Sequence, residues 1–363
     1  MVTMPTAEGA PDARWTRSIR RRLLAWFRRH ARDLPWRRTR DPYCVWVSEI
    51  MLQQTQVATV IDYYQRFLQA WPTVGDLARA DEQQVLRLWE GLGYYRRARQ
   101  LQQAAQRVMA EHGGVIPRDL ASLRALPGIG RYTAGAIASI AWDVRAPILE
   151  ANSTRVLARW LAYAGDPSRA AGQRRLWSLA EHLLPRHQVG LFNQALMELG
   201  SEICTPRTPG CRQCPVSSLC PTQARGWQSR IPRVARRPRY EDVYEMAVVV
   251  RRGTQVLLRQ CGPEERWAGL WDFIRFPVNR ESLSHTDEEL ASRVQELTGL
   301  HVSIGRRLAR IKHGVTRFRI TLLCREARVL AGRLRRPGLR WIPASELPDY
   351  PLSVTGRKIS RLL

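Results

Sequence analysis

The segment from Cys204 to Cys220 reads CTPRTPGCRQCPVSSLC, which spaces four cysteines as C-x6-C-x2-C-x5-C with no histidine among them. The thiolates of Cys204, Cys211, Cys214 and Cys220 can surround one metal centre. Structural zinc sites usually pair two short hooks, whereas this asymmetric spacing suits a cubane iron–sulfur cluster. The other three cysteines lie singly, and no secretory pattern at the start favours disulfides. We therefore predict a [4Fe-4S] cluster that closes the first domain.

The composition indicates a globular protein that binds a polyanion. The 363 residues are 44% hydrophobic, and 58 Lys and Arg face 32 Asp and Glu, which gives a net charge of +26. Neutralising phosphates releases counterions and supplies affinity, so nucleic acid is the first expectation. Arginine-rich codon usage is an alternative source of arginine, but it would not leave the acids so outnumbered. No apolar stretch has membrane-spanning length, so we expect a cytoplasmic protein, nucleoid-associated if prokaryotic, without membrane partners.

The pattern of hydrophobic residues divides the chain into two domains. Residues 1–14 are expected to be a disordered tail, residues 15–220 a helical domain, residues 221–240 an Arg- and Pro-rich linker, and residues 241–363 an α+β domain. Helices are predicted over 15–30, 43–52, 57–71, 81–91, 94–112, 120–125, 132–141, 153–164, 173–184 and 191–203. In the second domain a helix is predicted over 288–297 and strands over 246–251, 255–260, 271–276, 302–311, 317–324 and 339–342.

A glycine-containing turn, Leu126-Pro127-Gly128-Ile129-Gly130, separates two of the predicted helices. Gly128 and Gly130 permit close approach of the backbone. Free N–H groups at the start of the next helix attract anions such as a DNA phosphate. This is the pattern of a helix-hairpin-helix, although any tight turn between two helices is an alternative. The four cysteines that follow favour the helix-hairpin-helix.

Together these features resemble the MutY family of adenine DNA glycosylases, in the endonuclease III or helix-hairpin-helix superfamily, over nearly the whole chain. Further matching segments carry the resemblance: Leu34 to Arg37 (LPWR), Val47 to Val57 (VSEIMLQQTQV), Gly91 to Tyr95 (GLGYY) and Phe192 to Gly200 (FNQALMELG). The resemblance implies an all-α glycosylase domain with a [4Fe-4S] loop, joined to an α+β Nudix-like domain. It also implies excision of adenine mispaired with 8-oxoguanine or G in double-stranded DNA, by a monomer.

Cleavage of an N-glycosidic bond needs a proton on the leaving base and negative charge near the cationic sugar, which two carboxyl groups in different environments can supply. By resemblance Glu49 is the acid that protonates adenine and later helps to activate water. The family's Leu-Asp-Gly-Asn reads Leu149-Glu150-Ala151-Asn152 here, so Glu150 stands at the position of the catalytic aspartate with Asn152 orienting it. The alternative is that Glu150 only caps the helix that follows.

The resemblance assigns further residues to DNA. Gln54 and Tyr94 would enter the base stack beside the extruded adenine. Trp36 and Leu52 would line the adenine pocket, Glu198 would hydrogen-bond the purine edge, and Arg37 would contact a phosphate. Plain core packing is the alternative for each of these pocket residues. Bifunctional relatives form a Schiff base through a lysine where this chain has Tyr132, and no lysine precedes Lys312, so we expect a monofunctional enzyme with Tyr132 lining the sugar pocket.

The second domain departs from the hydrolases that it resembles. Of the three glutamates in the core of the Nudix motif, only Glu296 remains within residues 292–300, so magnesium-dependent hydrolysis of oxidised nucleotides is not expected. The family's Phe-Ser-His loop for 8-oxoguanine aligns with Val315-Thr316-Arg317, where Thr316 keeps a hydroxyl. An edge strand without a ligand is the alternative. Other hypotheses for the whole chain are a glycosylase for T opposite G and a lesion-binding protein with impaired catalysis.

Overall fold

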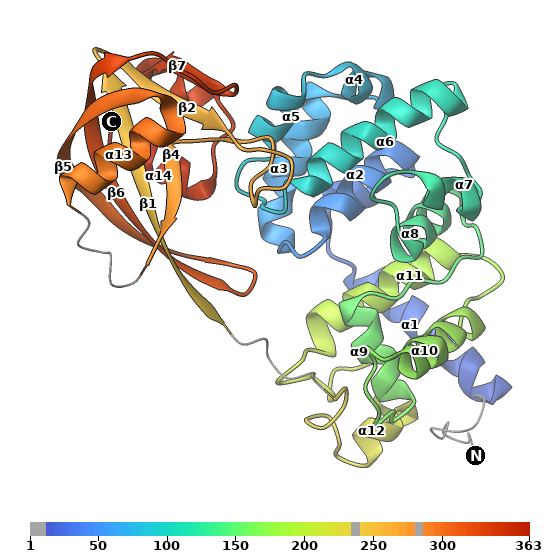
Figure 1. Ribbon diagram of the computed structural model, residues 1–363. Coiled ribbons are helices and arrows are strands. Elements are labelled where there is room, and N and C mark those ends of the chain that lie inside the picture. Colours follow the sequence, from blue (N-terminus) through green and yellow to red (C-terminus); the bar gives the residue numbers. More distant parts are fainter. Residues whose placement is uncertain (1–11, 234–239, 280–285) are drawn as a thin grey trace. The chain divides into compact units, whose positions relative to one another are not determined.

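A computed structural model describes residues 12–233, 240–279 and 286–363. Contacts between Cα atoms divide the chain into two compact units: unit 1 comprises Met1–Arg79 and Gln103–Arg236, and unit 2 comprises Ala80–Gln102 and Arg237–Leu363. The predicted helical first domain and α+β second domain are confirmed (Figure 1). The two units differ from the predicted domains in one respect: residues 80–102, which were predicted to belong to the helical domain, belong to unit 2. Among the described residues, no helix is long and apolar enough to cross a membrane.

Unit 1 is built from helices whose ends follow local sequence signals. Asp41 begins α2, where its side chain accepts a hydrogen bond from the N–H of Cys44, and Pro42 takes the first helical position. Asp119 caps α7 in the same way. The helices are α1 (Ala13–His30), α2 (Pro42–Leu52), α3 (Val57–Ala70), α4 (Val74–Arg79), α7 (Leu120–Ala125), α8 (Arg131–Trp142), α9 (Ala151–Trp160), α10 (Ala170–His182), α11 (Val189–Glu198) and α12 (Pro221–Ala224). Helix α5 (Glu82–Leu88) belongs to unit 2, and α6 (Arg96–His112) belongs to unit 2 up to Gln102 and to unit 1 from Gln103.

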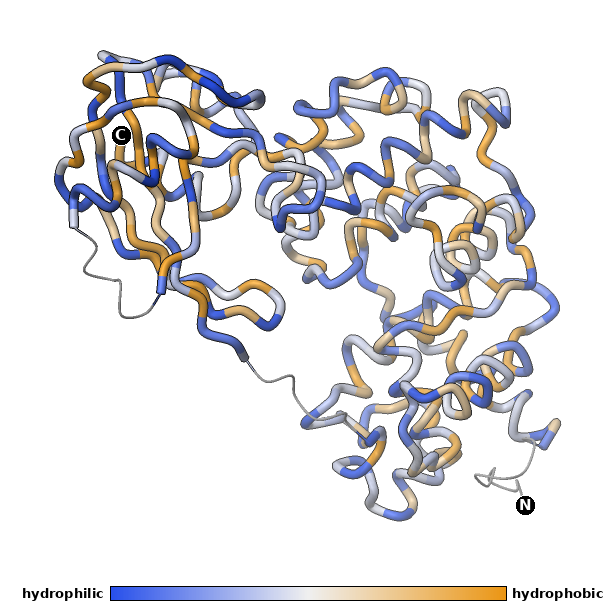
Figure 2. The backbone as a smooth tube through the Cα atoms, viewed as in Figure 1, coloured by the Kyte–Doolittle hydropathy of each residue, from blue (hydrophilic) through white to orange (hydrophobic). Residues whose placement is uncertain are grey.

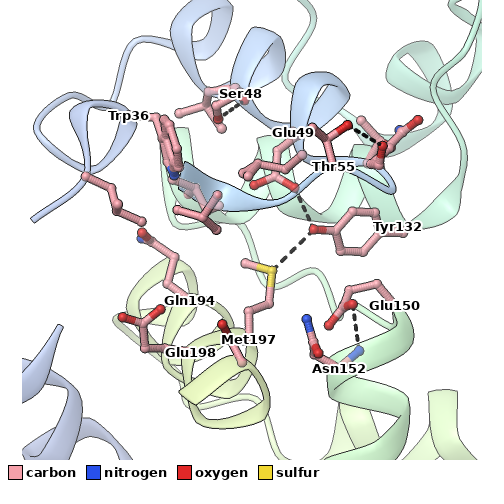
Figure 3. A pocket seen from close by; sticks show the side chains of 18 of the residues that line it. Trp36, Ser48, Glu49, Thr55, Tyr132, Glu150, Asn152, Gln194, Met197 and Glu198 are labelled. Atoms are coloured by element: carbon pink, nitrogen blue, oxygen red, sulfur yellow. Dashed lines mark hydrogen bonds between the residues drawn. The ribbon is translucent and has the colours of Figure 1, made fainter. Parts of the chain in front are cut away.

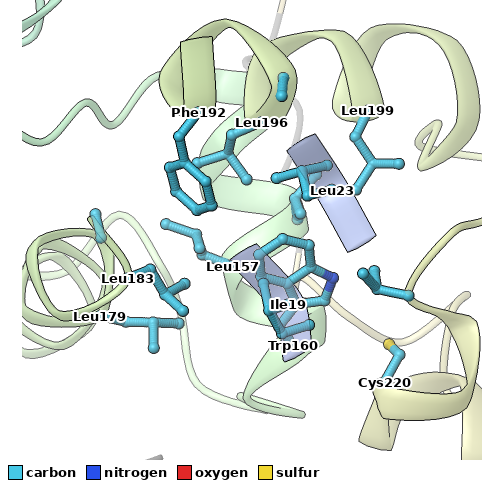
Figure 4. Close-up of a cluster of buried hydrophobic side chains, with 14 of the residues drawn as sticks. Ile19, Leu23, Leu157, Trp160, Leu179, Leu183, Phe192, Leu196, Leu199 and Cys220 are labelled. Carbon is cyan, nitrogen blue, oxygen red and sulfur yellow. The ribbon is translucent and has the colours of Figure 1, made fainter. Parts of the chain in front are cut away.

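The main core of unit 1 packs α1 against α9, α10 and α11, with Ile19 and Leu23 of α1 facing Leu157 and Trp160 of α9 (Figure 4). Hydrophobic and hydrophilic stretches alternate along these helices, as amphipathic packing requires (Figure 2). Full burial of one such side chain contributes about 1.5–3 kcal/mol. Cys220 belongs to this core, so the end of the cysteine segment packs against these helices.

The interpretation of residues 221–240 as an extended linker is wrong for its first half. Residues 221–224 form α12, and the hydroxyl of Thr222 donates to the carbonyl oxygen of Arg159 at 2.6 Å. Ile231 is 2% exposed, and its carbonyl oxygen accepts from Nε of the buried Arg159. The prolines and arginines hid this packing, because few hydrophobic residues mark it. The predicted tail at residues 1–14 also ends early, since α1 begins at Ala13; residues 1–11 and 234–239 lie outside the described residues.

Unit 2 contains a mixed sheet of seven strands in the order β3-β2-β1-β6-β5, with β4 paired to β1 and β7 paired to β2. The strands are β1 (Glu241–Arg252), β2 (Gln255–Gln260), β3 (Trp271–Asp272), β4 (Ile274–Val278), β5 (Leu300–Val315), β6 (Phe318–Gly332) and β7 (Leu339–Pro343). Helices α13 (Asp287–Thr298) and α14 (Val354–Ser360) complete the unit. Successive residues of β1 join different cores: Val248 packs with α13, and Val249 packs with α14, which the sequence had not predicted.

Candidate active site

A cavity of about 510 Å³ opens in unit 1 between α2, α8, α9 and α11. Its size suits a small ligand or a single nucleobase. The structure brings together eleven of the residues that the sequence assigned to catalysis or DNA: Trp36, Arg37, Glu49, Leu52, Gln54, Gly128, Gly130, Tyr132, Glu150, Asn152 and Glu198. Tyr94, Thr316 and the four cysteines do not line it.

Glu49 lies on α2, and its side chain, which ends in a carboxyl group, is almost entirely buried. Only 4% of Glu49 is exposed, because its neighbours on α2 fill the interior around it. Removal from water disfavours the charged form, and nearby Glu150 adds repulsion, so the pKa of Glu49 rises to about 7. A hydrogen bond from Tyr132 and the charge of Arg37 oppose this rise. The result is a carboxyl group that can hold a proton near neutral pH, as general acid catalysis requires.

Tyr132 lies between the two carboxyl groups and is hydrogen-bonded to Glu49 (Figure 3). Its hydroxyl donates to Oε2 of Glu49 at 2.6 Å and lies 3.2 Å from the sulfur of Met197. Burial and the charges of Glu49 and Glu150 hold the pKa of Tyr132 well above its usual value, so the phenol stays protonated and remains a donor. Figure 3 shows its ring between the carboxyl side chains of Glu49 and Glu150.

Glu150 both caps a helix and lines the cavity, so the two interpretations of its role are compatible. At the N-cap of α9, its Oε2 accepts from the N–H of Asn152 and its Oε1 from the N–H of Ser153, each at 2.7 Å. Burial raises the pKa of Glu150, while these hydrogen bonds and the charge of Arg155 lower it. Glu150 thus accepts two main-chain N–H groups, whereas Glu49 accepts from the side-chain hydroxyl of Tyr132.

Asn152 contacts Glu150 through its main chain. The main-chain N–H of Asn152, and not its side-chain amide, bonds to the carboxylate. The side-chain oxygen of Asn152 instead accepts from Nη2 of Arg155 at 2.7 Å. A Cβ added to Gly200 would lie 2.7 Å from Cβ of Asn152, so this glycine lets the turn after α11 approach closely.

Glu198 and Arg37 form an internal network that the sequence had not predicted. Glu198 is 1% exposed, and its carboxylate accepts from the guanidinium groups of both Arg32 and Arg37. These donors hold the pKa of Glu198 down to about 2 despite burial. The side chain of Arg37 is only 14% exposed and is already paired with Glu198, and its contact with a phosphate stays a prediction. Arg32 was missed, because only tertiary contact distinguishes it from other arginines of this chain.

The hairpin between α7 and α8 has the features of an anion site. Gly128 has a φ of 76°, which favours glycine, and the N–H of Ile129 closes the turn on the carbonyl oxygen of Leu126. Gly130 begins α8 without a side-chain cap. A Cβ added there would meet nothing within 4 Å, so the backbone is accessible. The start of α8 therefore offers N–H groups to an approaching anion.

The two residues expected to enter the base stack share an unusual backbone. Gln54 (φ 57°) and Tyr94 (φ 48°) are among six non-glycine residues with positive φ in the described ranges, and both side chains are exposed. Such conformations cost about 1–3 kcal/mol and often occur at functional sites. Gln54 lines the cavity and belongs to unit 1, whereas Tyr94 belongs to unit 2.

The cysteine segment lies in unit 1, beside the helices of the main core. Cys214 is influenced electrostatically by the other three thiols, which places all four near one another. Nη1 of Arg159 lies 3.2 Å from Sγ of Cys204. Within the described ranges, no three Cys, His, Asp or Glu side chains converge as ligands of a single ion would.

In unit 2, the segment Val315-Thr316-Arg317, which aligns with the family's Phe-Ser-His loop, is a tight turn between β5 and β6. Val315 pairs with Phe318, which leaves Thr316 (φ 51°) and Arg317 exposed at the tip. The hydroxyl of Thr316 bonds only its neighbour's carbonyl oxygen, so it can exchange partners. Glu296, the remaining glutamate of the hydrolase motif, is ion-paired with Arg293 on the surface of α13.

Comparisons with known proteins agree with this geometry. A family model described as HhH-GPD superfamily base excision DNA repair protein matches residues 47–182, and a NUDIX domain model matches residues 245–362. The chain is 44% identical over 291 residues to the adenine DNA glycosylase of Rattus norvegicus, covering 78% of this chain and 55% of the rat protein. It is 33% identical over 262 residues to the adenine DNA glycosylase of Buchnera aphidicola subsp. Acyrthosiphon pisum (strain APS), covering 72% of this chain and 75% of that protein.

Among solved structures, the chain is similar to a thermostable thymine-DNA glycosylase, with 31% identity and a TM-score of 0.54 over 58% of this chain and 98% of that one. The chain spans 55%, 51% and 59% of the length of the rat, mouse and human relatives.

Proposed function

This chain belongs to the family of adenine DNA glycosylases, and on that premise we propose that it removes adenine mispaired with 8-oxoguanine or G from duplex DNA. The observation that carries the proposal is the pair of carboxyl groups in one cavity, Glu49 and Glu150, whose surroundings differ. Such pairs divide acid and charge-stabilising roles between them. We also propose a monomer as the working unit.

The proposed reaction begins with adenine extruded into the cavity. Protonated Glu49 gives its proton to a ring nitrogen of adenine, the N-glycosidic bond breaks, and both electrons of that bond leave with the base. The carboxylate of Glu150 faces the resulting sugar cation and stabilises it. Glu49, now ionised, accepts a proton from water while the water oxygen bonds to the sugar carbon. The products are free adenine and an abasic site.

The test is a panel of duplexes that differ only in one base pair. Purified protein is incubated with A:8-oxoguanine, A:G, A:C and T:G duplexes, and the released base is identified by chromatography. We expect adenine release, fastest from A:8-oxoguanine and then from A:G. Release of thymine from T:G would favour the second candidate, for which the similarity to a thymine-DNA glycosylase is the supporting observation. Tight binding without release of any base would favour a lesion-binding protein.

The rate of excision is expected to fall as pH rises through about 7. The pKa of Glu49 is raised to about 7, so its carboxyl group is protonated below this pH and ionised above it. Only the protonated form can donate to adenine, so the alkaline side of the profile should decline with that pKa. Single-turnover rates across a series of buffers at constant ionic strength measure this. A rate that rises through neutral pH would contradict the role of Glu49.

We expect the enzyme to be monofunctional. A lyase that works through a Schiff base needs an amine at the sugar, and the only lysines, Lys312 and Lys358, lie in unit 2. The hydroxyl of Tyr132 at the cavity cannot form an imine. Treatment with borohydride during the reaction should therefore trap no covalent adduct between protein and DNA, while a bifunctional relative serves as the positive control. Adduct formation at a yield similar to that control would refute this prediction.

We propose that Cys204, Cys211, Cys214 and Cys220 hold a [4Fe-4S] cluster. The donor set of four nearby thiols supports this, and a bound cluster would cross-link the segment between Cys204 and Cys220. Arg159 would remain the neighbour of Cys204, because it already donates to five carbonyl oxygens in residues 204–206 and 228–231. For unit 2 we propose recognition of 8-oxoguanine, with Thr316 at the exposed turn as the contact, and no hydrolase activity.

A further inference from the structure

Ser153 is a buried hydroxyl behind Glu150 to which the proposed reaction assigns no role. It is 0% exposed and does not line the cavity, so it cannot contact a substrate. Its Oγ accepts from the main-chain N–H of Glu150 at 2.8 Å and lies 3.2 Å from the carbonyl oxygen of that residue. One side chain thus holds both main-chain polar groups of the residue that carries the carboxylate.

The hydrogen bonds between Glu150 and Ser153 are reciprocal. The side chain of Glu150 accepts from the N–H of Ser153, and the side chain of Ser153 accepts from the N–H of Glu150, which makes a capping box at the start of α9. In the usual box a short Ser or Thr occupies the first position and Glu or Gln the fourth. Here the order is reversed, so the long side chain is the cap and the short one fixes the backbone.

This reversal matters because the side chain of glutamate has more rotatable bonds than those of Ser, Thr, Asp and Asn, which are preferred at an N-cap. A glutamate reaches the N–H groups of Asn152 and Ser153 only if its main chain is held in a suitable conformation. At Glu150 that conformation is extended, with φ −129° and ψ −173°. The hydroxyl of Ser153 is hydrogen-bonded to the main-chain N–H and C=O groups of Glu150, which flank these two dihedral angles.

We propose that Ser153 is a positioning residue, whose hydroxyl fixes the main chain of Glu150 so that the longer carboxylate is held at the wall of the cavity. This inference rests on the proposed function. An aspartate would reach the same N–H groups without help, and the inference explains how the longer Glu150 can take the same place. Ser153 acts only through Glu150.

The surroundings of Glu150 provide a readout that a purely structural role would not change. Glu49 of α2 and Tyr132 of α8 face the carboxylate, and Arg155 lies one turn further along α9. Hydrogen bonds from Ser153 lower the pKa of Glu150 against the effect of burial. Without the hydroxyl, the pKa of Glu150 should rise, and the acid side of the rate profile should move to higher pH.

The experiment compares the cluster-containing wild type with Ser153→Ala, Ser153→Thr and Thr154→Ala. Single-turnover release of adenine from an A:8-oxoguanine duplex is measured across pH, together with affinity for a duplex that cannot be cleaved. Because misplacement by about 1 Å can cost on the order of a hundredfold, Ser153→Ala should slow release about tenfold or more with affinity unchanged. Ser153→Thr retains the hydroxyl and should recover most of the rate. Thr154→Ala removes a neighbouring hydroxyl that lines no cavity and should behave as wild type.

A second comparison keeps the inference testable if a threonine does not fit this buried position. In a Glu150→Asp background, the shorter acid caps α9 by itself, so adding Ser153→Ala should cost much less than it does with Glu150. Equal losses in both backgrounds, or a Ser153→Ala protein with the wild-type rate and pH profile, would overturn the inference while the proposed function stands. A wild type that releases no adenine would instead overturn the proposed function and this inference with it.

Discussion

Replacing Glu49 with glutamine should reduce adenine release by at least a factor of about 10² to 10⁴, the range that general acid catalysis contributes. The substitution keeps the shape of the side chain and an oxygen that can accept from Tyr132, but it removes the proton that adenine needs. The measurement is single-turnover release of adenine from an A:8-oxoguanine duplex.

A loss of structure can be separated from a loss of chemistry in this variant. The pKa of Glu49 is raised from 4.5 to about 7 in the folded protein, so its contribution to stability is fully present below 4.5 and is lost as pH rises through about 7. Glutamine cannot ionise, so Glu49→Gln should melt no lower than wild type above that pH. Affinity for uncleaved duplex should also persist. A stable, binding variant with the wild-type rate would remove Glu49 from the mechanism.

Replacing Glu150 with glutamine should bring adenine release close to background, a loss of about a hundredfold or more, as when one group that stabilises charge in a transition state is removed. The amide carries no charge to face the sugar cation. Its single oxygen replaces only one of the two carboxylate oxygens that accept N–H groups at the start of α9, and its NH2 group cannot accept the other bond. The rate is measured as for Glu49, with circular dichroism as the control for the helix.

Glu150→Asp is the matched comparison for this prediction. Aspartate keeps the charge and is a favoured N-cap residue, so α9 should remain intact and release should stay well above that of Glu150→Gln. This pair of variants separates the need for charge from the need for reach. If the glutamine variant kept full activity, Glu150 would be a cap and nothing more.

Local sequence signals predicted the elements of this fold well. The predicted helix at 120–125 has the observed bounds of α7, and the strand at 255–260 those of β2. The prediction of an extended linker was wrong for residues 221–231, because the packing of Ile231 depends on Arg159, a residue 72 positions away in the sequence. No local pattern carries such a contact.

In the candidate site, too, the sequence predicted some features, and others became visible only in the folded structure. The resemblance placed Glu49, Tyr132 and Glu150, and the structure brings their side chains into one cavity. It did not predict that Arg37 is paired with Glu198, or that Asn152 acts through its main chain. Ion pairs and helix caps depend on which groups meet after folding, and a single sequence with this many arginines gives no means of choosing among them.

The most direct test of the central claim is the rate of adenine release by the double variant Glu49→Gln, Glu150→Gln, set beside wild type and the two single variants on one A:8-oxoguanine duplex. If both carboxyl groups act on the same extruded base in one step, the wild type releases adenine, each single variant is severely impaired, and the double variant is little slower than the slower single. Two nearly active single variants, or a wild type that leaves the duplex uncut, would contradict the account.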